Sequence, residues 1–229
     1  MKKGFLSIVM LSMLSGGCDD GKIYDSSNEH SAPSGSTATV SGTFAGTDSY
    51  GDEYSVSLAA FTEEDGDYAV LSKAVSDTGI TTLSGIGSQV TSIEICLLNR
   101  LRKRIVTFAN IPFAESEHYD AGTLNTGLYA TIQEYIFTAS CAQCHGGSNS
   151  AAANLYLTAD KSYGSLTGEP STKIEGKMRV IPGDAAESVL WQTIGTSVSD
   201  EWAFRHTELT TNQSADLIRT WIELGAKEE

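Results

Sequence analysis

The hydrophobic periodicity of this chain changes between residues 113 and 126. In residues 38–113, short runs rich in Val, Ile, Thr and Tyr are separated by Gly, Asp and Asn, a pattern typical of strands and turns. After residue 126, apolar side chains recur at the spacing of one helix face, as at Leu128, Ile132, Ile136 and Ala139. A chain with this change of period is expected to form a β-domain followed by an α-domain.

The boundaries of these parts follow from local composition. We expect an antiparallel β-sandwich, immunoglobulin-like or transthyretin-like, over residues 38–113, a linker over 114–125 and a helical domain over 126–229. The six expected strands are residues 39–44, 54–61, 68–74, 81–85, 91–99 and 104–110. Cys96 falls in the fifth strand and is expected to be a small buried side chain. The nearby basic residues, including Arg104, are expected at a solvated hairpin end.

Two capping patterns predict helix starts in the C-terminal part. Asp184 with Glu187 forms one and Thr210 with Gln213 the other. The final helix carries a stripe that includes Trp221, and Gly225 is expected to end it.

The N-terminus has the features of an export signal. Two lysines precede an apolar stretch over residues 5–14, which is too short to span a bilayer. The following Leu-Ser-Gly-Gly-Cys18 resembles the lipobox of bacterial lipoproteins, which implies removal of residues 1–17 and acylation of Cys18. Residues 18–37 are polar and are expected to form a tether. Ordinary signal cleavage is the alternative, and either route exports the protein.

The acidic composition narrows the choice of partners. The chain has 15 Lys and Arg against 29 Asp and Glu, a formal net charge of −14. Such a surface repels nucleic acid and anionic lipid headgroups, so neither is expected as a partner. Membrane attachment would then depend on the lipid at Cys18. The expected location is the cell envelope, on either the inner or the outer membrane, with the protein facing the periplasm or the outside.

The pentapeptide Cys141-Ala142-Gln143-Cys144-His145 carries the most specific chemistry in the sequence. This spacing allows two thiols to add to the vinyl groups of one haem while the next histidine binds the iron. We therefore expect one covalent haem c on Cys141 and Cys144, with His145 as the proximal ligand. A zinc site would need two further ligands without paired spacing, and a simple disulfide would leave His145 unexplained.

From Ile132 to the C-terminus the sequence resembles monohaem cytochrome c domains of the class I type. The resemblance rests on I-Q-x-x-I-F-x-x-x-C-A-Q-C-H-G-G, on R-V-I-P-G-D-x-x-x-S-V-L and on I-R-T-W-I-E-L-G-A. Such domains are often fused to other modules in bacterial lipoproteins, and the resemblance implies an all-α cytochrome c fold around one haem. Where the family commonly has Arg-Met-Pro, this chain has Arg205-His206-Thr207. By that position His206 is the expected distal ligand, Met178 is the alternative, and an open site is a third possibility.

These observations predict an electron-transfer haem protein rather than an enzyme, acting with redox protein partners. One alternative is a haem-based sensor or peroxidase-like protein with an open distal site. Another is a β-sandwich binding module with an accessory haem domain.

Overall fold

The computed structural model describes residues 35–112, 118–147 and 150–228, which belong to one compact unit. The export signal, Cys18 and nearly all of the expected tether lie outside these ranges. Among the described residues, no helix is both long and apolar enough to cross a membrane.

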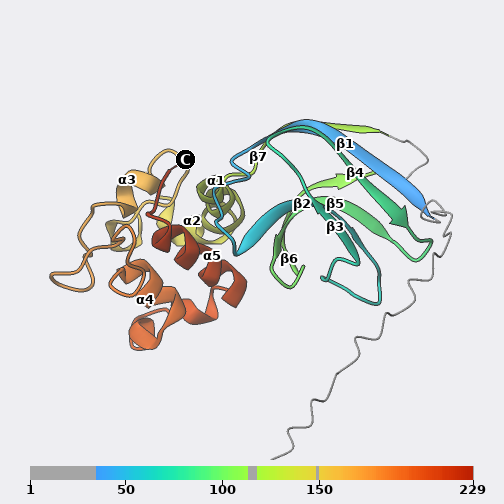
Figure 1. Cartoon of the computed structure of the whole chain (residues 1–229). Coiled ribbons are helices and arrows are strands. Elements are labelled where there is room, and N and C mark those ends of the chain that lie inside the picture. The colour runs from blue at the N-terminus through green and yellow to red at the C-terminus, as the bar shows by residue number, and fades with distance from the viewer. Residues whose placement is uncertain (1–34, 113–117, 148–149, 229) are drawn as a thin grey trace, which may run out of the picture. The chain divides into compact units, whose positions relative to one another are not determined.

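Seven strands form two sheets within the described ranges (Figure 1). The first sheet has the order β4-β1-β7 and the second has the order β3-β2-β5-β6. The strands are β1 (Ser36–Ala45), β2 (Tyr54–Phe61), β3 (Leu71–Ala74), β4 (Thr78–Ile86), β5 (Ser92–Asn99), β6 (Arg104–Ile111) and β7 (Tyr119–Asn125). The six expected strands correspond to β1 to β6, with ends that differ by three residues or fewer.

The seventh strand corrects the expected linker. Residues 119–125 form β7, which pairs parallel with β1, so the first sheet is not purely antiparallel. Because β7 ends at Asn125 and α1 (Leu128–Ile132) begins three residues later, the first helix starts directly from the sheet.

The individual helical elements of the C-terminal part are short. The first three follow one another without a break from Leu128 to His145: α1, then a π-helical segment η1 (Gln133–Cys141), then α2 (Ala142–His145). The remaining elements are the 3-10 turns η2 (Ala152–Asn154), η3 (Ser197–Ser199) and η4 (His206–Glu208) and the helices α3 (Ser162–Leu166), α4 (Val189–Gly195) and α5 (Asn212–Glu223).

The expected fold class, a β-sandwich domain followed by a separate all-α cytochrome c fold, is wrong. The described structure is mainly β, with two sheets and short helices, and residues 150–188 are largely turns joined by isolated bridges such as Thr167 with Val180. The physical reason lies in the sequence of that stretch. Its four glycines and two prolines interrupt any helical period.

The two capping patterns had different outcomes. Asp184 accepts a hydrogen bond from the Glu187 backbone N–H at 3.0 Å, but this closes a turn, and α4 begins only at Val189. At α5 the cap is Thr211, one residue after the expected position, and its hydroxyl accepts from the Ser214 N–H at 3.1 Å. Gly225, with φ of 100°, follows the helix as expected.

One hydrophobic core joins the sheets to the helices. Its buried members run from Val40 and Leu58 in the sheets to Ile132 and Trp221 in the helices. At the junction, the buried Tyr50 hydroxyl lies 2.6 Å from the Thr126 carbonyl oxygen and 2.7 Å from the Thr131 hydroxyl. The sheets therefore fix the position of the first helix, which ends in the haem motif.

The outer face of the second sheet holds a smaller cluster, formed by Ala59, Phe61, Ala69, Cys96 and Leu98. Cys96 is buried there, as expected, and burial raises its thiol pKa to about 12. Beside this cluster the buried Glu94 carboxylate accepts from Arg104 at 2.6 Å and from Thr107 at 2.7 Å. Arg104 is therefore a partner of a buried carboxylate rather than part of a solvated hairpin end.

Candidate haem site

The two cysteines of the motif lie on the last turns of the first helix. Cys141 ends the π-helical segment and caps α2, and Cys144 lies within α2. Residues three apart on a helix share one side of it, so both sulfur atoms can reach one ligand. Both are free thiols, Cys141 half-buried and Cys144 exposed. Burial raises the pKa of the Cys141 thiol to about 11, so near neutral pH it is protonated.

His145 has one ring nitrogen committed to the backbone. Its Nδ1 lies 3.0 Å from the carbonyl oxygen of Ala152 and 3.3 Å from that of Leu155. A carbonyl oxygen can only accept, so Nδ1 carries the proton and Nε2 keeps a free lone pair. This is the arrangement that orients a metal-binding imidazole.

His206 also has its Nδ1 hydrogen-bonded to a main-chain carbonyl oxygen. Its Nδ1 lies 3.0 Å from the Phe204 carbonyl oxygen, and its backbone N–H donates to the buried Ser199 hydroxyl at 3.0 Å. Burial lowers the pKa of His206 below its usual value and His145 lowers it further, although the hydrogen bond to Phe204 acts in the opposite direction. The ring is therefore neutral near pH 7, with Nε2 available to a metal.

The fold brings these two rings together from positions 61 residues apart. The ring centroids of His145 and His206 lie 6.3 Å apart, and the ring planes make an angle of 40°. Two imidazoles on opposite sides of one metal ion, with bonds of about 2.0 Å, have centroids about 6 to 6.5 Å apart. The separation therefore fits one metal ion between the rings.

Within the described ranges, no three or more His, Cys, Asp or Glu side chains gather in a group that could hold a metal ion. His145 and His206 supply two imidazole donors, which is the number of protein ligands that a haem iron takes in addition to the four porphyrin nitrogens. The two histidines therefore fit a haem.

Apolar side chains surround His206 at the surface. Phe204 is 65% exposed and Leu209 is 62% exposed, and Trp202 meets the His206 ring edge-on at a centroid distance of 5.9 Å.

Two further residues were predicted from the sequence, Met178 as the alternative distal ligand and Cys18 as the lipid attachment site. Met178 is half-buried, forms a backbone bridge with Pro170, and its carbonyl oxygen accepts from the Val189 N–H at 3.1 Å. Cys18 lies outside the described residues.

Two residues that support the histidines were not predicted. Ser199 binds the His206 backbone, and Arg179 donates to the turn whose carbonyl groups contact His145. Arg179 is the first residue of the R-V-I-P-G-D segment on which the resemblance rests, but the sequence does not indicate its contacts or those of Ser199, because these contacts are made across loops.

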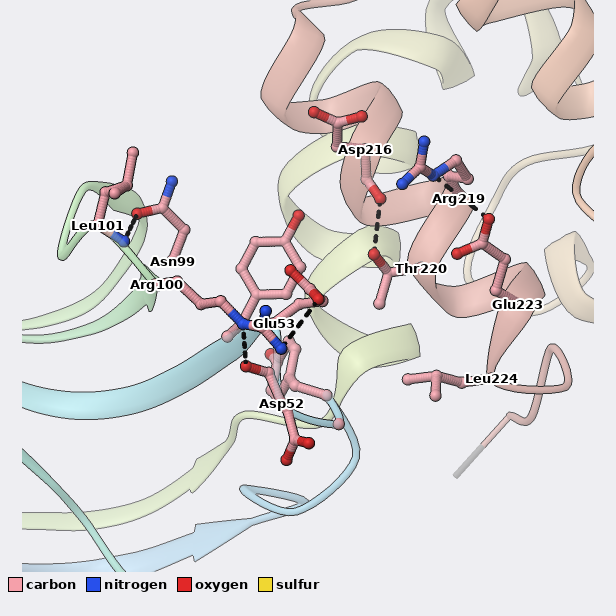
Figure 2. A pocket seen from close by; sticks show the side chains of 13 residues that line it. Asp52, Glu53, Asn99, Arg100, Leu101, Asp216, Arg219, Thr220, Glu223 and Leu224 are labelled. Carbon is pink, nitrogen blue, oxygen red and sulfur yellow. Dashed lines mark hydrogen bonds and ion pairs between the residues drawn. The ribbon is translucent and has the colours of Figure 1, made fainter. Parts of the chain in front are cut away.

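A separate cavity of about 570 Å³ lies between the start of β2, the β5–β6 turn and α5 (Figure 2). Four of its charged side chains form two ion pairs, Arg100 with Glu53 at 3.2 Å and Arg219 with Glu223 at 3.4 Å. None of the haem-motif residues lines it.

No protein-family model matches this chain, and no curated protein matches it. Among solved structures it is similar to the hydrazine synthase of Kuenenia stuttgartiensis, with 14% identity and a TM-score of 0.30, over 89% of this chain and 44% of that chain. The chain thus spans less than half the length of that protein's chain, and a likeness at this level carries no functional argument.

Proposed function

We propose that this chain is an exported haem protein that transfers single electrons. One haem would be held covalently by Cys141 and Cys144, and His145 and His206 would bind its iron. The observation that carries the proposal is the pair of imidazole rings 6.3 Å apart beside a pair of free thiols on the preceding helix turn. When bound, the haem supplies an iron that changes its oxidation state by one electron.

Two axial histidines favour electron transfer over ligand chemistry. A small molecule such as oxygen or peroxide must bind directly to the iron, and His206 would occupy the position that it needs. The contacts of His206 support this role, because its ring and backbone are held by Phe204 and Ser199. Histidine in place of methionine also lowers the reduction potential, which suits a more reducing partner.

We propose that the haem would exchange electrons with a redox protein partner. The net charge of −14 favours a partner with a basic docking surface.

We also propose the location that the sequence predicts. The chain is held in the cell envelope by a lipid on Cys18, on the inner or outer membrane. The test is to replace Cys18 by Ser and to follow the protein between membrane and soluble fractions. We expect release from the membrane with haem content unchanged; retention in the membrane fraction would refute the lipid anchor.

The haem proposal is tested by absorption spectroscopy of the full chain produced in cells that attach haem c. We expect a low-spin spectrum, haem that stays with the denatured protein, and no rapid binding of carbon monoxide. The Cys141→Ser, Cys144→Ser variant should lose the covalent haem. Rapid carbon monoxide binding by the unaltered protein would instead support a ligand-binding or peroxidase-like function.

The distal ligand is tested by a matched pair of variants. His206→Ala should give a high-spin spectrum that responds to carbon monoxide, because one axial position is opened. Met178→Leu should keep the low-spin spectrum, because that side chain has no role at the iron. If His206→Ala keeps the low-spin spectrum and Met178→Leu loses it, the assignment of His206 is wrong.

A further inference from the structure

Arg179 is a buried cation close to the loop that binds His145. The residue is 8% exposed, and burial lowers the pKa of its guanidinium, which nevertheless stays protonated because the pKa of arginine is so high. Among the described residues, no carboxylate forms an ion pair with it, and Glu169 acts on it only through longer-range electrostatics. A buried charge must be satisfied by hydrogen bonds, so its contacts are informative.

The guanidinium donates to main-chain carbonyl oxygens of two segments. Nη1 lies 2.7 Å from the Ser165 oxygen, and Nη2 lies 3.0 Å from the Asn154 oxygen and 3.3 Å from the Ala153 oxygen. The planar fork of arginine suits such a cluster of acceptors, whereas a lysine ammonium cannot reach them in the same geometry. Arg179 therefore ties the turn at residues 152–155 to the end of α3.

That turn is the one that holds His145. The carbonyl oxygens of Ala152 and Leu155 contact His145 Nδ1, and those of Ala153 and Asn154, between them, contact Arg179. Ala153 and Asn154 have φ of 53° and 52°, in the left-handed region. Asparagine adopts this backbone readily, but alanine rarely does, so the strain lies at Ala153. The Thr172 hydroxyl adds a further contact, donating to the Ala153 oxygen at 2.8 Å.

We propose that Arg179 is a positioning residue for His145, because it holds the strained turn at residues 152–155. In this position the Ala152 and Leu155 carbonyl oxygens keep the proton on His145 Nδ1, which leaves Nε2 free for iron. The inference rests on the proposed function only in that the ligand of Nε2 is iron. The hydrogen bonds of His145 are properties of the protein itself.

The experiment compares Arg179→Gln and Arg179→Lys with Arg100→Gln, which removes an exposed arginine of the same charge far from the turn. Nitrogen NMR of histidine-labelled full chain without haem reports which ring nitrogen of His145 carries the proton. We expect the unaltered chain and Arg100→Gln to hold the proton on Nδ1. In Arg179→Gln the signals should shift toward Nε2–H, the tautomer that free histidine favours, with exchange of the ring proton with solvent faster by about tenfold.

The same variants are compared in the haem-loaded protein by electron paramagnetic resonance of the ferric state, which depends on the relative orientation of the axial imidazole planes. We expect a changed spectrum in Arg179→Gln and Arg179→Lys and an unchanged one in Arg100→Gln. Thermal unfolding of each variant identifies those that remain folded. Thr172→Val, which removes only one contact to the turn, should shift the tautomer in the same direction but less. A folded Arg179→Gln with the proton still on Nδ1 and slow exchange would overturn the inference, whereas a chain that never binds haem would refute only the proposed function.

Discussion

Replacing Arg104 by Ala should destabilise the protein much more than the same change at Arg100, four residues earlier. The Glu94 side chain is 4% exposed, and its carboxylate accepts from Arg104 at 2.6 Å. Removing one partner of a buried ion pair leaves an uncompensated charge, which costs about 3 to 5 kcal/mol. Glu94 keeps its hydrogen bonds from Thr107 and Ser92, so we expect a loss at the lower end, about 3 kcal/mol.

The comparison with Arg100 isolates the effect of burial. Arg100 pairs with Glu53 at 3.2 Å, but the two side chains are 62% and 58% exposed. Solvent screens such a pair, and its loss should cost about 0.5 kcal/mol. Arg104 also lies over the Phe61 ring at 4.7 Å, a contact that Arg100→Ala leaves intact.

The assay is denaturant unfolding of both variants, together with the Glu94→Gln background. In that background the buried charge is gone, so Arg104→Ala should cost about 1 kcal/mol rather than 3. The reasoning is refuted if Arg104→Ala and Arg100→Ala lower the free energy of unfolding equally. It is also refuted if the cost of Arg104→Ala is the same with Glu or Gln at position 94.

Two further predictions concern the junction and the thiols. A methyl group at Gly46, where φ is 80°, would lie 2.6 Å from the Gly127 Cα. Gly46→Ala should therefore lower the free energy of unfolding by about 3 kcal/mol. Gly66→Ala is the control, because nothing lies within 4 Å of the added methyl group, and it should lower the free energy of unfolding by about 1 kcal/mol. In the haem-free chain at pH 8, iodoacetamide should alkylate Cys144 well before Cys141, whose pKa is about 11. Equal alkylation rates of the two thiols at pH 8 would contradict this order of reactivity. Because burial raises the pKa of the Cys141 thiol, the protonated thiol is favoured in the folded chain. The contribution of this thiol to the free energy of unfolding is therefore present below pH 9 and should fall between pH 9 and 11.

The strands were predictable because their signals are local. β2 coincides with its expected range, since its apolar run lies between residues that favour turns. β7 was missed because its sequence, Tyr-Asp-Ala-Gly-Thr-Leu-Asn, has little to bury, and much of it is exposed at the edge of the first sheet. Its pairing with β1 depends on tertiary contacts that no local pattern encodes.

The site was predictable in part, for a different reason. The spacing of Cys141, Cys144 and His145 by itself predicts haem attachment, so these candidate residues could be named without a structure. The expectation that His206 lies opposite His145 came only from a resemblance, because the two histidines lie 61 positions apart in the sequence. Arg179 belongs to the R-V-I-P-G-D segment of the resemblance, but its contacts could not be predicted, since they are made to main-chain carbonyl groups, which every residue has. The error about the fold arose at the same stretch, where real helical stripes at both ends were extended across a region without one.

The π-helical segment at Gln133–Cys141 determines where the first helix can lose or gain a residue. Its wider hydrogen-bonding pattern, seen where the Ala142 N–H donates to the Phe137 oxygen, accommodates one more residue than an α-helix of the same rise. Deleting a single residue from this segment could restore α-helical winding and leave the thiol pair facing the same way, whereas a deletion in α1, where the winding is already regular, would turn everything after it by about 100°. The π-helical segment is therefore the part of this helix where a change of one residue in length should disturb cofactor attachment least.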